Sequence, residues 1–254
     1  MNHRALTEYS ILEIYDSVTL LWLLIITVSG IHNYTMAKLN FTKPVLILLY
    51  GYPGSGKTYF SRQLVDEVNI ANLQADRIRT EMFEKPTYTQ QEDAVVQRIM
   101  NYLTEELLSA GVSVVYDTNA LRLSQRRALK EIATSSKAVE VIVWFQIDVE
   151  SSFTRVATRD RRQTDSKYAM TLDRTTYDSI LQYMQNPTTS EDYIVVSGKQ
   201  YFKTQFATLS KKLRDIKAFE PSDKDNPVIK PGLVNLIPSS SLRSTINRRN
   251  IFIR

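Results

Sequence analysis

Residues 44–58 read PVLILLYGYPGSGKT, and this stretch decides the fold. Its first half, Pro44–Tyr50, is a short and continuous apolar run, as expected for a strand that is buried on both faces. Its second half, Gly51–Thr58, has the spacing G-x-x-x-x-G-K-[ST] of a phosphate-binding loop, and a helical pattern follows it. The stretch therefore predicts a phosphate site between the first strand and the first helix of an α/β domain.

The residues of this loop suit the binding of a nucleotide. Glycines let backbone N–H groups converge on phosphate oxygens, and the helix N-terminus adds partial positive charge. We expect the Lys57 amine to reach the β- and γ-phosphates and the Thr58 hydroxyl to bind Mg²⁺. The expected nucleotide-binding residues are Gly51, Tyr52, Pro53, Gly54, Ser55, Gly56, Lys57, Thr58 and Tyr59.

The composition of the 254 residues narrows the chemistry further. Hydrophobic residues make up 43% and charged residues 23%, which is typical of a soluble globular protein. Cysteine is absent, and the two histidines lie at positions 3 and 32, so thiol catalysis, zinc–thiolate sites and a Ser-His-Asp triad are excluded from the main body. A net charge of +5 is not the balance of a dedicated DNA-binding domain. Carboxylates, Lys, Arg, hydroxyls and backbone amides remain, and these suit phosphate chemistry.

Strand and helix patterns alternate from the loop to about residue 217, which predicts a mostly parallel sheet flanked by helices. The further strands are expected over 70–74, 112–116, 139–146 and 193–196. The helices are expected over 57–67, 76–84, 89–110, 124–133, 152–162, 173–184 and 204–217, the third of them opened by a capping box at Thr89 and Glu92. Ligands of such sheets bind beyond the carboxyl ends of the strands, so the residues that follow each strand are the candidates for chemistry.

Two carboxylates follow expected strands. Asp117 comes after the strand over 112–116 and could orient Mg²⁺ or its waters, although Asp117 or Asn119 could instead only cap the next helix. Asp76 follows the strand over 70–74 and could accept a proton from an attacking hydroxyl. Arg79 would share its helical face and hold the acceptor, unless Asp76 is a simple N-cap and Arg79 is solvated.

Arg155, Arg159 and Arg162 are spaced to form one stripe on the expected helix over 152–162. Such a stripe above the loop would neutralise the charge of a transferring phosphoryl group. The polar stretch 163–171 would then be a lid that excludes water. The alternative is a solvated basic face.

Several motifs together resemble a known family. GYPGSGKT at 51–58, Asp76-x-x-Arg79, VVYDTNALRLSQRRAL after the strand over 112–116, and FQIDVESSFTRVATRDRR near residue 155 resemble the P-loop kinase group. This group includes polynucleotide 5′-kinase domains and zeta-toxin-like kinases, and many members are described as AAA-family ATP-binding proteins. The resemblance covers about residues 42–200.

The resemblance implies a P-loop NTPase fold with a five-stranded parallel sheet, and ATP as the nucleotide. It makes Asp76 the base and places Arg79 at the acceptor, while Arg155 and Arg159 belong to a lid. We also expect Asp117 and Asn119 to contact the substrate. Together with Lys57 these residues would transfer the γ-phosphate of ATP to a hydroxyl of a small molecule or nucleic acid. The alternative is a nucleotide-dependent switch or slow ATPase that acts on a protein partner.

The two ends of the chain differ from the middle. Residues 1–35 contain the apolar run Val18–Val28, which is short for a membrane span. They are explained by a mis-called start ahead of Met36, by a membrane anchor over 17–37, or by an extra packed helix. Residues 221–254 form a basic tail rich in Pro and Ser that could contact a protein partner. We expect a kinase domain over 36–220 and a cytoplasmic protein.

Overall fold

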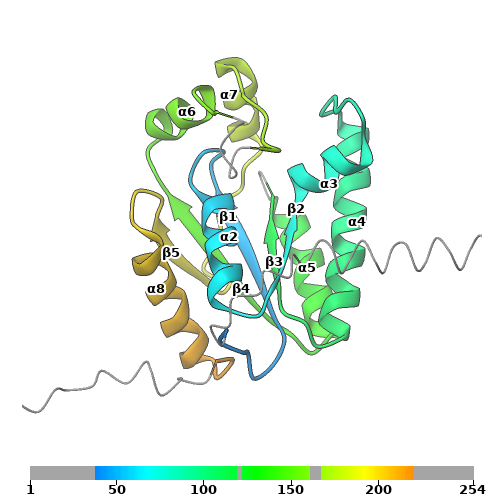
Figure 1. Ribbon diagram of the computed structural model, residues 1–254, viewed down its shortest axis with the longest axis vertical. Coiled ribbons are helices and arrows are strands. Elements are labelled where there is room, and N and C mark those ends of the chain that lie inside the picture. Colours follow the sequence, from blue (N-terminus) through cyan, green and yellow to red (C-terminus); the bar gives the residue numbers. More distant parts are fainter. Residues whose placement is uncertain (1–37, 119–121, 161–166, 220–254) are drawn as a thin grey trace, which may run out of the picture. The chain divides into compact units, whose positions relative to one another are not determined.

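The computed structural model describes residues 38–118, 122–160 and 167–219, and these residues form a five-stranded sheet between layers of helices (Figure 1). All neighbouring strands are parallel, in the order β2-β3-β1-β4-β5. The strands are β1 (Val45–Gly51), β2 (Ala71–Gln74), β3 (Val114–Asp117), β4 (Val139–Gln146) and β5 (Tyr193–Ser197). The predicted P-loop NTPase fold is confirmed, with the apolar strand β1 at its centre.

Every residue of β1 is buried, because helices cover both faces of the sheet. Alternate side chains such as Ile47 pack beneath α2 (Lys57–Glu67) and α8 (Phe202–Asp215). The side chains between them, such as Leu48, pack beneath α4 (Gln90–Ser109) and α5 (Leu123–Ser135), with α3 (Ala75–Met82) beside them. Because both faces of β1 are covered, the strand is held firmly at the centre of the sheet. Its last residue, Gly51, is the first residue of the glycine-rich loop.

Two short helices lie beyond the carboxyl ends of the strands, at the top of Figure 1. They are α6 (Val149–Ala157) and α7 (Arg174–Gln182). They share a small core of their own, built on Val156, Leu172 and Tyr177. This core holds both helices above the edge at which ligands of parallel sheets bind.

Two local predictions are wrong. The helix expected over 152–162 spans Val149–Ala157. It starts earlier because Asp148 caps its N-terminus by accepting the Ser151 N–H at 2.8 Å. Arg159 lies beyond this helix, so it does not continue a helical stripe from Arg155. The capping box at Thr89 and Glu92 forms only in part. The Thr89 hydroxyl accepts the Glu92 N–H as expected. The Glu92 carboxylate, however, accepts the backbone N–H groups of Thr87 and Tyr88 and not the Thr89 N–H.

The predictions for both ends of the chain fall on residues 1–37 and 220–254, outside the described residues, and they stay predictions. Within the part of the chain that the structure describes, no helix combines the length and apolar character that a membrane crossing needs.

Candidate nucleotide and phosphate site

The glycine-rich loop joins β1 to α2, and its neighbours force glycine at two positions. Gly54 has φ +84°, and a Cβ there would lie 2.4 Å from the Ser152 carbonyl oxygen in α6. Gly51 has φ +149°, and a Cβ there would lie 2.6 Å from the Phe145 carbonyl oxygen at the end of β4. The loop is therefore pressed against both β4 and α6, which holds its backbone in place.

Lys57 is the first residue of α2, and its side chain folds back over the loop. Its amine donates hydrogen bonds to the carbonyl oxygens of Gly51 at 2.8 Å and Tyr52 at 2.9 Å. Burial lowers the pKa of Lys57 to about 8, while the negative charge of Asp117 opposes this shift. The loop thus presents a desolvated amine at its centre, where a phosphate would lie.

Asp117 ends β3, next to the loop, because β3 pairs directly with β1. The carboxyl group is buried and accepts hydrogen bonds from the hydroxyls of Thr58 and Ser61. Burial raises its pKa, and Lys57 opposes the rise. A carboxylate oxygen beside the Thr58 hydroxyl is the kind of ligand pair that Mg²⁺ prefers. Among the described residues no group of three or more acidic or histidine side chains gathers for a metal.

Asp76 lies on the other side of Asp117, in the first turn of α3. Gln74 at the end of β2 is in register with Asp117, and the helix starts at the next residue. Burial raises the pKa of Asp76 to about 6, with a further contribution from the charge of Asp117. The structure therefore brings two carboxyl groups from neighbouring strand ends together beside Lys57.

Arg155 and Arg159 both face this region, but in different ways. Arg155 is exposed and its Nη1 donates to the carbonyl oxygens of Gly198 at 2.9 Å and Gly54 at 3.4 Å. Arg159 donates to the Met170 carbonyl at 2.9 Å. Burial lowers the pKa of Arg159, against the charges of Asp76 and Asp117. Arg155 thus borders the loop, whereas Arg159 faces the carboxylates.

Arg79 lies one turn after Asp76, and its charge is already paired. Its guanidinium binds the carboxylates of Glu92, at 3.0 Å, and Asp93. It also lies 4.7 Å from the centre of the Tyr88 ring. The two remaining candidates, Asn119 and Arg162, lie outside the described residues.

Several further residues that no sequence motif marks also shape the site. Gly198 follows β5 and packs against the loop, since a Cβ there would lie 2.5 Å from the Ser55 carbonyl oxygen. The Ser-Gly pair that ends β5 was the available signal, and it indicates only a turn. A cavity of about 450 Å³ opens beside the loop, lined by Tyr50, Gly51, Tyr52, Trp144, Phe145, Gln146, Ile147, Asp148, Ser197 and Lys199.

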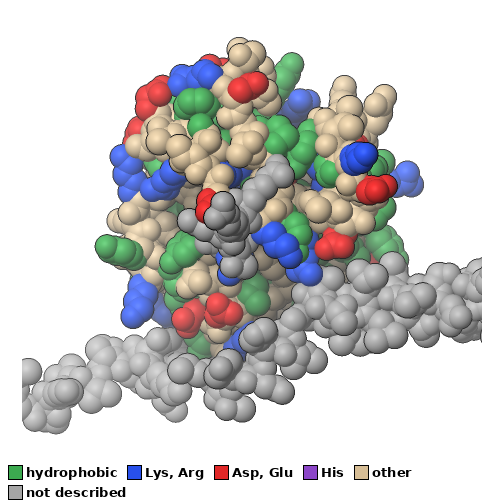
Figure 2. Space-filling view, turned by 45° about the horizontal axis from the view of Figure 1, so that its top comes forward, with side chains coloured by type: hydrophobic (Ala, Val, Ile, Leu, Met, Phe, Trp, Pro, Cys, Tyr) green, Lys and Arg blue, Asp and Glu red, His purple; other side chains and the backbone are tan. Residues whose placement is uncertain are grey.

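Figure 2 views this end of the molecule with its top brought forward. On the described part of the surface in this view, Lys and Arg side chains mix with acidic and apolar ones. The mixture agrees with the modest net charge of +5.

A family model described as an AAA domain matches residues 46–187, more than half of the chain. No curated protein matches the sequence significantly. The match covers the loop and both carboxylates, and it confirms the resemblance to P-loop kinases at the level of family.

Solved structures, two of them of kinases, share the fold. A gluconokinase from Sinorhizobium meliloti 1021 aligns with a TM-score of 0.50 at 17% identity, over 68% of this chain and 95% of its own. Kti12 from Chaetomium thermophilum, in complex with ADP-AlF3, gives 0.53 at 15% identity, over 68% and 99%. The APS kinase CysC from Mycobacterium tuberculosis, in complex with AMPPNP and APS, gives 0.50 at 15% identity, over 68% and 98%.

Proposed function

This chain belongs to the AAA domain family, and we propose that it is a kinase that transfers the γ-phosphate of ATP to a hydroxyl acceptor. The observation that carries the proposal is the position of Asp76. A half-buried carboxyl group with a pKa of about 6 lies among Lys57, Asp117 and Arg159. A second carboxylate, apart from Asp117, suits the general base that an attacking hydroxyl needs.

ATP is the proposed nucleotide, and residues 51–59 are its binding site. Two of the structural neighbours were solved with adenine nucleotides or their analogues, which supports this choice. Thr58 and Asp117 would hold Mg²⁺, and a bound Mg²⁺ neutralises charge on the phosphates and fixes their orientation. The Lys57 amine would turn from its two carbonyl partners to the β- and γ-phosphates.

Asp76 would act as the general base. Its carboxylate accepts the proton of the acceptor hydroxyl while that oxygen attacks the γ-phosphorus, and ADP leaves on the opposite side. Lys57, Arg155 and Arg159 would stabilise the charge of the transferred group. Arg79 and Asp117 would border the acceptor, with Asn119 as a further contact.

The acceptor is a small molecule or a nucleic-acid end, and we propose a cytoplasmic location. The proposed kinase domain spans residues 36–220. The tail over 221–254 would be available to a protein partner.

The test is transfer of labelled γ-phosphate from ATP to a mixed panel of hydroxyl acceptors by the full chain. Lys57→Ala and Asp76→Asn should each abolish label in the acceptor, while Asp66→Asn, an exposed site on α2, should leave it unchanged. Release of label only as free phosphate, with Asp76→Asn still active, would identify a switch or slow ATPase instead.

A further inference from the structure

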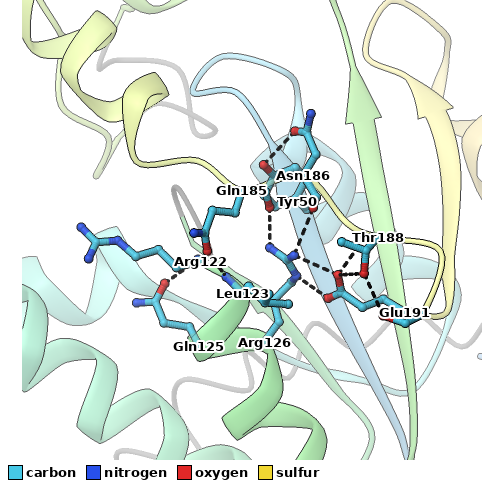
Figure 3. A network of polar contacts seen from close by, with 10 residues as sticks. Tyr50, Arg122, Leu123, Gln125, Arg126, Gln185, Asn186, Thr188 and Glu191 are labelled. Carbon is cyan, nitrogen blue, oxygen red and sulfur yellow. Dashed lines mark hydrogen bonds and ion pairs between the residues drawn. The ribbon is translucent and has the colours of Figure 1, made fainter.

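A buried arginine on α5, which has no role in the proposed phosphate transfer, connects three parts of the chain (Figure 3). Arg126 is only 1% exposed. Its Nε and Nη2 donate to the two carboxylate oxygens of Glu191, at 2.6 and 3.0 Å. Its Nη1 and Nη2 also donate to the carbonyl oxygens of Gln185 at 2.7 Å and Asn186 at 3.4 Å. Arg126 therefore fixes the connection between α7 and β5.

The same guanidinium lies against the strand that leads into the phosphate loop. Its central carbon is 5.2 Å from the centre of the Tyr50 ring, and Tyr50 is the residue immediately before Gly51. The Tyr50 hydroxyl donates to the side-chain oxygen of Asn186 at 3.0 Å, so the ring is held on both sides. Figure 3 shows Arg126 between Tyr50 and Asn186 on one side and Glu191 on the other.

A second pair of contacts ties the start of α5 to the same connection. The Leu123 N–H donates to the Gln185 side-chain oxygen at 2.9 Å, and the Arg122 guanidinium lies 4.9 Å from the centre of the Tyr183 ring. Arg122 and Leu123, at the start of α5, thus also contact the segment Tyr183–Glu191.

A buried ion pair is weak evidence for stability, because the cost of removing two charges from water offsets their attraction. Such a pair does fix geometry, since each partner has few acceptable positions. Here the geometry reaches the phosphate site in two steps. Tyr50 sets the position of Gly51, and the Gly51 carbonyl oxygen accepts a hydrogen bond from the Lys57 amine at 2.8 Å.

We infer that Arg126 is a positioning residue of the nucleotide site: paired with Glu191, it holds Tyr50 and the α7–β5 connection so that the loop over Gly51–Thr58 is preorganised for ATP. The inference rests on the nucleotide binding in the proposed function, but not on phosphate transfer to any acceptor.

The test uses the full chain carrying Arg126→Met together with Glu191→Gln. This double variant removes both charges and keeps a side-chain oxygen at position 191 for the Thr188 N–H, which Glu191 accepts at 2.9 Å. Arg127→Met is the matched control, because Arg127 is the next residue on the same helix and is exposed. Three quantities are measured: the melting temperature, the dissociation constant of Mg·ATP, and the amide hydrogen exchange of residues 51–58 without nucleotide.

In the double variant we expect ATP affinity to fall about tenfold or more and the loop amides to exchange faster, with a melting temperature close to wild type. The control should match wild type in all three. A folded double variant with unchanged affinity and unchanged loop exchange would overturn the inference, because Arg126 would then only fill space.

Tyr50→Phe keeps the test decisive if the double variant does not fold. It removes only the hydrogen bond to Asn186, and it should weaken ATP binding by about threefold and speed loop exchange. No change in either would overturn the inference. Wild-type protein that binds ATP but transfers no phosphate would refute only the kinase proposal. The inference about Arg126 could still be tested, because the comparison of amide hydrogen exchange needs no nucleotide.

Discussion

Arg79 donates from Nη1 to Glu92 Oε2 at 3.0 Å, and this buried ion pair joins α3 to the first turn of α4. The Glu92 carboxylate also accepts the N–H groups of Thr87 and Tyr88, both at 2.8 Å. Tyr88 has φ +55° and lies with its ring against Arg79. The pair therefore fixes the segment that enters α4, in which Tyr88 has a backbone conformation that a tyrosine seldom adopts.

Replacing this arginine should lower stability as well as activity. Arg79→Met takes the cation away from the Glu92 carboxylate, and we expect a clear loss in the free energy of unfolding, measured by urea denaturation. Arg98→Met, at an exposed position on α4, should cost less than about 0.5 kcal/mol. Equal stability of the two variants would show that the ion pair does not hold this segment.

The sequence predicted the fold because the decisive signals are local. The helix expected over 57–67 and the strand over 139–146 have the bounds that the structure gives them, since a glycine-rich loop and a continuous apolar run are short-range patterns. The neighbouring carboxylates Asp76 and Asp117 were also found, because the carboxyl ends of parallel strands meet at one edge.

The ion pairs could not be predicted in the same way. Arg126 and Glu191 are 65 residues apart. Arg126 lies within the stretch 114–129 that resembles the P-loop kinases, but no pattern in the sequence marks either residue as buried. The partners of Arg79 lie on another helix, and only the packing of α3 on α4 brings them together. Both bounds of α6 differ from the expected range 152–162. The three arginines suggest a helical face that continues to Arg162, whereas Asp148, which has the side chain of an N-cap, starts the helix earlier.

Gly54 should be essential for ATP binding. Gly54→Ala adds a methyl group 2.4 Å from the Ser152 carbonyl oxygen at φ +84°, so α6 or the loop must move. We expect the dissociation constant of ATP, measured by calorimetry, to rise by at least about tenfold.

Gly111→Ala is the matched control for this change. Gly111 has φ +82° but no atom within 4 Å of the added methyl group. It should cost about 1–2 kcal/mol of stability through the left-handed backbone and leave ATP binding unchanged. If both variants bind ATP like wild type, the close approach of α6 to the loop has no role in binding.

Phosphate transfer should depend on the protonation of Asp76. Burial raises its pKa to about 6, and a general base works only when it is ionised. We therefore expect kcat/KM to increase about tenfold per pH unit below pH 6 and to level off above it. The profile is measured with the acceptor from the labelling panel, and a rate independent of pH between 5 and 7 would argue against Asp76 as the base.

Glu140 on β4 should make the protein less stable at neutral pH than at mildly acidic pH. Burial raises its pKa from 4.5 to about 7, with Lys130 and Arg126 opposing and Glu191 and Asp192 reinforcing the rise. Because the folded state then holds its proton more tightly than the unfolded state, the Glu140 contribution to the free energy of unfolding falls as pH rises from about 4.5 to about 7.

The variant Glu140→Gln tests this dependence on pH, because it removes the charge and keeps the shape of the side chain. It should stabilise the protein by roughly 1–3 kcal/mol at pH 8, with little effect at pH 4.5. Urea denaturation of wild type and variant at the two pH values measures the difference, and an equal change at both would mean that Glu140 does not titrate in this range. Glu131→Gln, at an exposed position on α5, is the control and should show no such dependence on pH.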